Sequence, residues 1–128
     1  MSVGLLIITH DSIGTAMLET ASGILGHCPL AARALAITPQ ADPDRSRDRA
    51  DLLRRELDQG DGVLVLTDLF GSTPANIAMS LMHPGRVSVA AGLNLPMLVR
   101  ILNYAHLNLD ALTEKAVYGG RDGVFLCE

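Results

Sequence analysis

The chain has 128 residues, 48% of them hydrophobic and only 3% aromatic, which is typical of one domain with a core of aliphatic side chains. Ten Lys and Arg residues against fourteen Asp and Glu residues give a net charge of −4, and the lack of a Lys/Arg-rich block argues against a nucleic-acid partner. No apolar run approaches the ~20 residues of a membrane span, and the first residues lack the basic leader of a secretory signal. The two cysteines, Cys28 and Cys127, fit neither a disulfide framework nor a metal-ligand cluster, so we expect the reducing cytoplasm as the compartment. Together these features predict a single domain over residues 1–128 without membrane insertion.

A histidine follows the carboxyl end of the first predicted strand. Apolar residues dominate the segment Val3–Ile8, as in a parallel strand that is buried on both faces. Polarity returns abruptly in Thr9–Ser12 (THDS), which contains His10. Ligands of open α/β sheets bind outside the carboxyl ends of the strands, so His10 is the first candidate site residue.

Strand and helix patterns alternate along the rest of the chain. Further strands are predicted over Ala31–Ile37, Val63–Leu66, Val87–Ala91 and Gly123–Cys127. Helices are predicted from Ile13 to a stop at Gly26, over Asp44–Gln59, from Thr73 and Pro74 onward, through Leu98–Ala105, and over Leu109–Ala116 before a break at Gly119 and Gly120. The side chains expected to be buried in the first three helices are Ile13, Met17, Ala21 and Ile24; Ala50, Leu53 and Leu57; and Ile77, Ala78, Leu81 and Met82.

A second polar cluster follows the strand Val63–Leu66. Asp68 begins a loop that runs to Ser72 and leads directly into a helix, for which Thr73 is the predicted N-cap and Pro74 the first residue. Backbone N–H groups at such a helix start can bind an anion.

Strands that alternate with helices at this spacing predict an α/β fold. We expect an open, doubly wound, mainly parallel sheet with helices on both faces and right-handed crossovers. In the common strand order 2-1-3-4-5 the first and third strands are neighbours, which would bring His10 and Asp68 to one crevice, with Gly92–Pro96 on its rim. The last strand, Gly123–Cys127, is expected to be an antiparallel edge strand or to be exchanged with another subunit.

A histidine and an aspartate in one crevice favour phosphoryl chemistry. A carboxylate that accepts one N–H of a neutral imidazole fixes the tautomer and aims the other nitrogen outward, where it can attack phosphorus. Asp68 would then stabilise the ring of His10 as it becomes cationic. N–H groups around Ser72–Ala75 and the Thr73 hydroxyl can donate to the phosphoryl oxygens, and this transfer needs little beyond positioning and charge stabilisation.

Four segments carry a resemblance to a known family. They are the strand end Thr9–His10, TDLFGSTPAN (Thr67–Asn76), GLNLPM (Gly92–Met97) and GRDGV (Gly120–Val124). With these motifs in this order and spacing, nearly end to end, the chain resembles the mannose-type IIA component of the bacterial sugar phosphotransferase system (PTS). Members of that family accept a phosphoryl group on histidine from the phosphocarrier protein HPr.

The resemblance implies a phosphotransferase in which His10 is phosphorylated and Asp68 is its carboxylate partner. It also implies that Ser72 and Thr73 bind the phosphate, that a IIB protein or a regulatory target is the next partner, and that no cofactor or metal takes part. Members of the family form homodimers, and in some of them the terminal strand joins the sheet of the partner. Further candidate residues on the rim of the site are Thr9, Asp11, Phe70, Gly71 and Asn94.

Two positions depart from the family pattern. Asp11 stands where glycine is usual, and Ser72 stands where the loop usually has a second glycine. We expect Asp11 to repel an incoming phosphate and Ser72 to restrict the backbone of its loop.

Other interpretations of the same residues remain open. Phosphorylation of His10 would serve sugar import through a IIB protein, or it would report phosphotransferase flux to a regulatory target. A third hypothesis is a metal-dependent hydrolase with His10 and Asp68 as ligands, although a catalytic zinc usually needs three protein ligands. Thr73 and Asn94 are also expected as helix caps. The histidines interpreted as structural are His27, His83 and His106.

Overall fold

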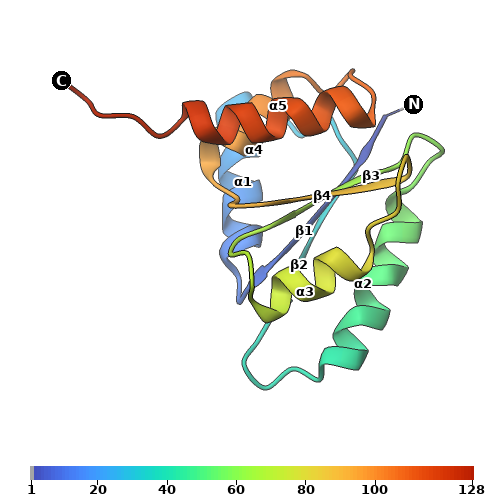
Figure 1. Cartoon of the computed structure of the whole chain (residues 1–128). Coiled ribbons are helices and arrows are strands. Elements are labelled where there is room, and N and C mark those ends of the chain that lie inside the picture. The colour runs from blue at the N-terminus through green and yellow to red at the C-terminus, as the bar shows by residue number, and fades with distance from the viewer. Residues whose placement is uncertain (1) are drawn as a thin grey trace.

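Four parallel strands form one sheet in the computed structural model, which describes residues 2–128 (Figure 1). The strands are β1 (Gly4–His10), β2 (Ala32–Ile37), β3 (Val63–Thr67) and β4 (Val87–Ala91). The helices are α1 (Ile13–Leu25), α2 (Pro43–Leu57), α3 (Thr73–Ser80), α4 (Leu95–Asn103) and α5 (Leu109–Asp122). The strand order is β2-β1-β3-β4, which confirms the predicted open parallel α/β sheet with β1 beside β3.

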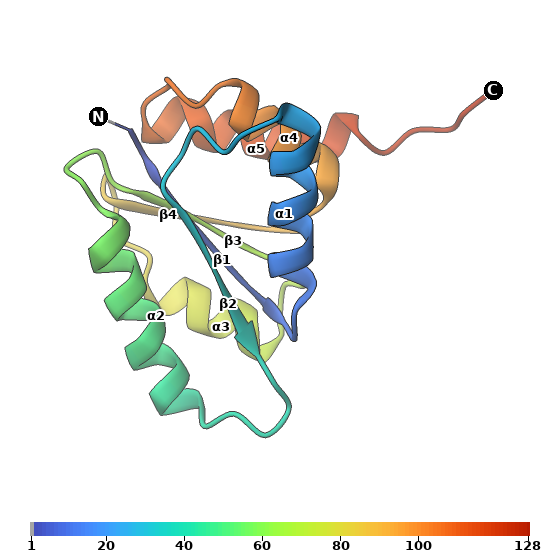
Figure 2. The same ribbon diagram turned by 180° about the vertical axis from the view of Figure 1, so that it is seen from behind.

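Helices cover both faces of the sheet. Helices α1, α4 and α5 pack on one face, and α2 and α3 pack on the other (Figures 1 and 2). The side chains of β1 alternate between the two hydrophobic cores, with Leu5 and Ile7 on the α1 side and Leu6 and Ile8 on the α2 side. All four side chains are fully buried, which confirms that the continuous apolar run reflects a strand buried on both faces.

The strand register brings three chain segments together at the carboxyl edge of the sheet. Ile8 of β1 pairs with Thr67 of β3, and His10 at the end of β1 pairs with Ile37 at the end of β2. The loops that lead from these strands into α1, α2 and α3 therefore meet at one edge.

The C-terminal part of the chain differs from the prediction. Helix α5 continues to Asp122, so Gly119 and Gly120 lie inside the helix and do not end it. A Cβ atom at Gly119 would lie 2.6 Å from Cβ of Arg100, and one at Gly120 would lie 2.8 Å from Cε of Met97. The two glycines therefore allow α5 to pack closely against α4.

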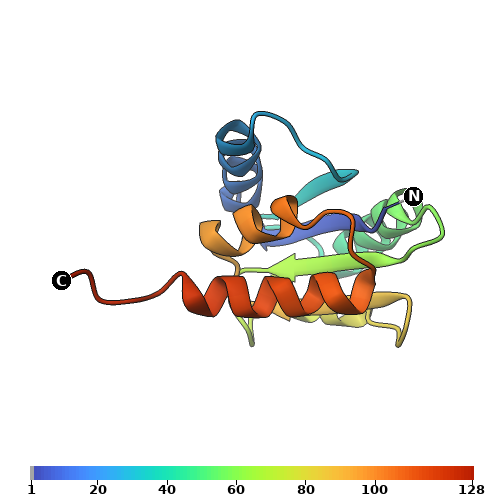
Figure 3. The same ribbon diagram turned by 90° about the horizontal axis from the view of Figure 1, so that it is seen from above.

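The predicted last strand, Gly123–Cys127, is not formed within the described chain. Residues 124–128 have no regular secondary structure and extend away from the body of the protein beyond α5 (Figure 3). Val124, Phe125 and Leu126 are 76%, 73% and 79% exposed. The prediction was wrong for a single chain because α5 carries the segment past the edge of the sheet, where no strand of residues 2–128 pairs with it.

The buried face of α1 also differs from the prediction. Ile13 and Ile24 are exposed, whereas Gly14 and Ala21 are buried. A Cβ atom at Gly14 would lie 2.7 Å from Cγ2 of Ile7, so a side chain at this position would prevent the close approach of α1 to β1. The predicted stop at Gly26 is confirmed by its left-handed C-cap conformation.

The other helices follow the prediction more closely. In α2 the three expected side chains, Ala50, Leu53 and Leu57, are buried. Helix α3 ends at Ser80, earlier than expected, and Met82 is 56% exposed instead of buried. Among the helices of residues 2–128, none combines the length and the apolar character needed to cross a membrane.

Candidate functional site

His10 and Asp68 are in direct contact at the carboxyl edge of the sheet. His10 is the last residue of β1, and Asp68 is the first residue after β3. One carboxylate oxygen of Asp68, Oδ2, accepts a hydrogen bond from the backbone N–H of His10 at 2.9 Å and lies 2.8 Å from the ring atom Nδ1. The predicted juxtaposition of these two residues is therefore confirmed.

This contact orients the imidazole ring. An ionised carboxylate can only accept, so Nδ1 donates its hydrogen to Asp68 and Nε2 keeps its lone pair. Burial alone would raise the pKa of Asp68, but hydrogen bonds from the backbone and ring of His10 and from the N–H of Leu69 together lower that pKa below its ordinary value. Asp68 is thus ionised at neutral pH. The side chain of His10 is 44% exposed, which leaves its outer nitrogen open to a reactant.

A cavity of about 280 Å³ opens beside His10. Its walls come from the ends of β1 and β2, the loop between β2 and α2, and the start of α3. The lining residues are His10, Asp11, Ile37, Thr38, Pro39, Ala41, Pro43, Thr73 and Pro74. No motif in the sequence indicates the wall after β2, although the predicted strand order already places the exits of β2 and β1 side by side.

Ser72 and Thr73 have different positions at the start of α3. The Ser72 hydroxyl donates to the carbonyl oxygen of Leu69 at 2.6 Å and accepts from the N–H of Ala75 at 3.4 Å, so Ser72 is the N-cap. The prediction that Thr73 is the N-cap was wrong by one residue, because Thr73 is already the first helical residue. Thr73 lines the cavity beside His10, whereas the hydroxyl of Ser72 is used within its own loop.

Asp11 and Ser72, the two residues that stand where the family usually has glycine, have different backbone conformations. Ser72 has φ −104° and ψ 170°, an extended conformation open to any residue, so serine causes no backbone strain at this position. Asp11 has φ +44°, in the left-handed region that favours glycine, asparagine and aspartate. Its N–H donates to the carbonyl oxygen of Ile37 at 3.0 Å, and its exposed side chain lies on the wall of the cavity.

Thr9 does not line the rim of the site; its buried side chain holds the turn that carries His10. Its side chain is buried, accepts a hydrogen bond from the N–H of Gly14 at 3.0 Å, and donates to the carbonyl oxygen of His10 at 3.2 Å. These contacts hold the turn between β1 and α1, from which the ring of His10 projects.

Phe70, Gly71 and Asn94 do not line the cavity beside His10. Phe70 is 71% exposed, and Gly71 turns the loop with φ +84°. Asn94 accepts from the N–H of Met97 at 2.9 Å, which confirms its predicted role as the N-cap of α4, and donates to the carbonyl oxygen of Gly120 at 3.1 Å.

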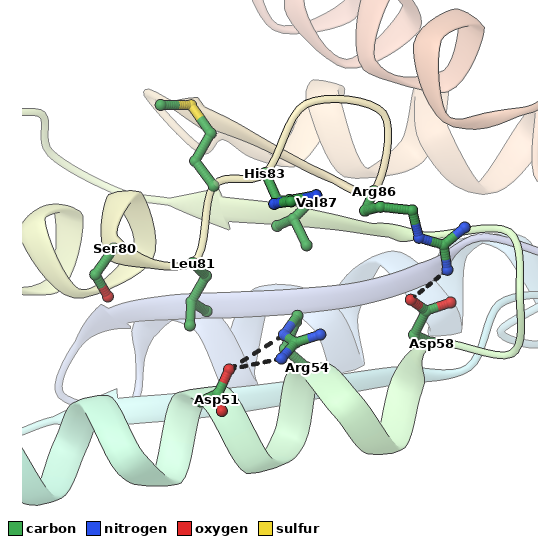
Figure 4. A pocket seen from close by; sticks show the side chains of 9 residues that line it. Asp51, Arg54, Asp58, Ser80, Leu81, His83, Arg86 and Val87 are labelled. Atoms are coloured by element: carbon green, nitrogen blue, oxygen red, sulfur yellow. Dashed lines mark hydrogen bonds and ion pairs between the residues drawn. The ribbon is translucent and has the colours of Figure 1, made fainter.

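A larger cavity, of about 390 Å³, lies between α2 and the start of β4 (Figure 4). Arg54 pairs there with Asp51 at 2.7 Å, and Arg86 pairs with Asp58 at 2.6 Å. Because these two cations and two anions compensate each other, the cavity presents no net charge from them to a ligand. It also lies at the amino end of β4, whereas parallel sheets bind ligands at the carboxyl ends of their strands. His83 lines this cavity and not the one beside His10.

Residues 2–128 contain no group of three or more His, Cys, Asp and Glu side chains that could hold a metal ion. The hydrolase hypothesis requires such a ligand set, so the described residues give it no support.

Comparison with known protein families agrees with this geometry. A family model described as "PTS system fructose IIA component" matches residues 4–117. The "PTS system mannose-specific EIIAB component" of Escherichia coli (strain K12) is 30% identical over 127 residues, which are 97% of this chain and 39% of that protein. The chain thus spans about two fifths of the length of this curated relative.

Two further relatives are named for different roles. The mannose/sorbose specific IIA subunit of the phosphotransferase system from Enterococcus faecalis has a solved structure that is 28% identical, with a TM-score of 0.79 over 100% of this chain and 96% of that chain. The transcriptional regulatory protein LevR of Bacillus subtilis (strain 168) is 30% identical over 116 residues, which are 86% of this chain and 12% of that protein. The same chain is therefore similar to a component of a phosphotransferase system and to part of a transcriptional regulatory protein.

Proposed function

The chain belongs to the family of the PTS system fructose IIA component, and we propose that it accepts a phosphoryl group from phosphorylated HPr on His10 and passes it to a IIB protein for sugar uptake. The observation that supports this most is the 2.8 Å contact between Nδ1 of His10 and Oδ2 of Asp68, because it leaves Nε2 as the available nucleophile. We propose that the reaction takes place in the cytoplasm and uses no cofactor.

In the proposed reaction the lone pair of His10 Nε2 attacks the phosphorus atom. The new N–P bond forms while the bond between phosphorus and the donor breaks, and the donor keeps that electron pair. The imidazole ring becomes cationic as both of its nitrogens carry substituents. Asp68 is already ionised and bound to Nδ1, so it stabilises the cation without further movement. In the next step the acceptor attacks the phosphorus and His10 leaves as a neutral ring.

The phosphoryl oxygens would lie against the start of α3. Thr73 lines the cavity and carries a hydroxyl and a backbone N–H that could donate, and the positive end of the helix dipole favours an anion. Pro74 has no N–H to offer. Because Ser72 donates its hydroxyl hydrogen to Leu69, we assign the direct phosphate contact to Thr73 and a supporting role in the loop to Ser72.

We also propose that the protein forms a homodimer. Strand β4 pairs with β3 on one side, and on its other side Val87 forms a single bridge with His83, so within residues 2–128 the rest of that edge has no strand partner. The exposed apolar segment Val124–Leu126 is the candidate for a strand that adds to this edge in a partner chain. Light scattering should show a dimer for the full chain and a monomer for a variant truncated after Gly123; a dimer in both would exclude this segment as the interface.

A second candidate function is regulatory. The similarity to LevR favours it, because that protein is named a transcriptional regulator. In this case His10 is phosphorylated by the same donor, but the phosphorylated and unphosphorylated forms would bind a target protein with different affinity, and no IIB protein would remove the group.

Labelling with phosphoenolpyruvate, enzyme I and HPr tests both functions. We expect an acid-labile, alkali-stable phosphate on the wild-type protein and on the control His27→Ala, whose histidine is exposed at the end of α1. His10→Ala should carry no label, and a labelled His10→Ala protein would exclude both functions. Loss of label only when IIB proteins and sugar are both added would support import over regulation.

A further inference from the structure

The carboxyl edge of the sheet carries only negative charge on its loops. The segments that join β1 to α1, β2 to α2, β3 to α3 and β4 to α4 contain three aspartates and no Lys, Arg or Glu. The three aspartates are Asp11, Asp42 and Asp68. A phosphoryl group brings about two further negative charges, so these loops have the wrong sign for binding it unaided. The cation at the β4 end of this edge, Arg121 of α5, lines a separate cavity with Ala91 and Gly92.

Two of the three aspartates have partners. Asp68 lies 2.8 Å from the ring of His10. Asp42 caps α2 by accepting from the N–H of Asp44 at 3.0 Å, and it lies 3.9 Å from Arg45. The charge of each is therefore at least partly compensated within the chain.

Asp11 is the aspartate without compensation. It has no ion-pair partner within residues 2–128 and lies on the wall of the cavity that His10 lines. Its backbone N–H is bound to the carbonyl oxygen of Ile37 at 3.0 Å, which fixes the residue next to the reacting ring. Neither Lys nor Arg lines the same cavity.

We propose that Asp11 makes His10 selective for partner proteins that present a cationic side chain beside the phosphoryl group. The inference rests on the proposed phosphorylation of His10. A Lys or Arg of the partner would contact the phosphoryl oxygens and the Asp11 carboxylate at the same time, and so would supply the positive charge that the cavity beside His10 lacks. A small phosphoryl donor, or a protein donor without such a cation, would meet only repulsion.

The same carboxylate affects the phosphorylated chain after the partner has left. The cation leaves with the partner, and Asp11 then faces the phosphoryl group without compensation. This repulsion raises the free energy of phosphorylated His10 and favours transfer to the next acceptor. Asp11 therefore speeds the encounter with a cationic partner and lowers the equilibrium amount of phosphorylated chain.

These two effects have opposite signs, which allows a direct test. The rate constant of transfer from phosphorylated HPr is measured between about 0.01 M and 1 M salt, together with the equilibrium distribution of phosphate between HPr and the chain. The variants are Asp11→Asn, which removes the charge and tolerates a positive φ, and Asp11→Gly, which also removes the backbone strain. The control Asp61→Asn removes a charge from an exposed loop at the opposite edge of the sheet.

We expect both Asp11 variants to react about fivefold more slowly than the wild type at low salt, as for the loss of one charge pair in water, and to match it at high salt. We expect the equilibrium to shift toward the phosphorylated chain by a similar factor. A mere loss of His10 positioning would slow the reaction at every salt concentration and would not favour the phosphorylated chain. A wild-type rate at low salt or a wild-type equilibrium in Asp11→Asn overturns the inference, whereas an unlabelled wild-type chain would instead count against the proposed function.

Discussion

A single oxygen of Asp68, Oδ2, holds both the backbone N–H of His10, at 2.9 Å, and the ring atom Nδ1 of His10, at 2.8 Å. The first contact ties the end of β1 to the loop after β3, and the second fixes the direction of the ring. Strand geometry and ring orientation thus depend on the same acceptor. The structural role needs only an oxygen at this position, whereas the stabilisation of a cationic ring needs a charge.

We expect Asp68→Asn to slow the phosphorylation of His10 and to leave the fold intact. The amide oxygen can still accept the backbone N–H, but the variant lacks the charge that stabilises the ring during transfer. Hydrogen bonds to charged groups contribute about 1.5–3 kcal/mol, which corresponds to a rate reduction of about 10- to 100-fold. Rapid-quench kinetics with phosphorylated HPr measures the rate, and circular dichroism checks the fold. Asp51→Asn, in the middle of α2 and outside the cavity beside His10, is the matched control; equal rates for both variants would show that the Asp68 carboxylate is dispensable.

We expect the free energy of unfolding to fall in acid, in part because of Asp68. Burial alone would raise its pKa, but hydrogen bonds from His10 and Leu69 lower that pKa below the ordinary aspartate value of about 3.9. The unfolded chain therefore binds this proton more readily than the folded chain. The resulting stabilisation is fully present above about pH 4 and is lost as the pH falls through the lowered pKa.

Guanidinium unfolding at a series of pH values measures this contribution. The loss of stability between pH values above and below the aspartate range should be smaller in Asp68→Asn than in the wild type. Asp51 and Asp58 also have lowered pKa values and remain in both proteins, so their contribution cancels in the comparison. The same pH profile in both proteins would contradict a specific role of Asp68 in acid sensitivity.

The central strands and the contact of His10 with Asp68 could be predicted because they follow from local patterns. The apolar run in β1 is explained by burial on two faces, and the polar residues after β1 and β3 mark their carboxyl ends. The strand order then brings these ends together. By contrast, the left-handed conformation of Asp11 comes with a hydrogen bond to Ile37, a residue of another strand. The glycine usual at this position in the family is the signal that could have indicated it.

The end of the chain was mispredicted because glycine has two structural uses. The pair Gly119 and Gly120 is typical of a break between a helix and a strand, but here it allows the close contact of α5 with α4. The residues that decide between these uses, Arg100 and Met97, lie about twenty positions earlier in the sequence, and only the packed structure shows them as neighbours.

Alanine at Gly119 and at Gly23 should change stability in opposite directions. Both glycines lie inside helices, where alanine is more favourable than glycine by about 1 kcal/mol. A Cβ at Gly23 has no neighbour within 4 Å, so we expect Gly23→Ala to stabilise the protein by roughly 0.5–1 kcal/mol. A Cβ at Gly119 would lie 2.6 Å from Cβ of Arg100, and overpacking of about 1–3 kcal/mol outweighs the helix preference. Chemical denaturation measures both; a stabilised Gly119→Ala protein would contradict the close packing of α5 on α4.

Substitutions at Ser72 and Thr73 should separate stability from phosphorylation. Ser72→Ala removes the N-cap of α3 and should cost about 1 kcal/mol of unfolding free energy, whereas Ser72→Gly should cost only a few tenths. Thr73→Ala removes a hydroxyl from the cavity beside His10 and should slow phosphorylation about tenfold with little change in stability. Thr73→Ser keeps the hydroxyl and is the control. Denaturation and the rate of transfer from phosphorylated HPr are measured for all four variants. If Ser72→Ala slows the transfer as much as Thr73→Ala does while both variants remain folded, both hydroxyls contact the phosphate. The Ser72 hydroxyl must then leave the carbonyl oxygen of Leu69 when phosphate binds.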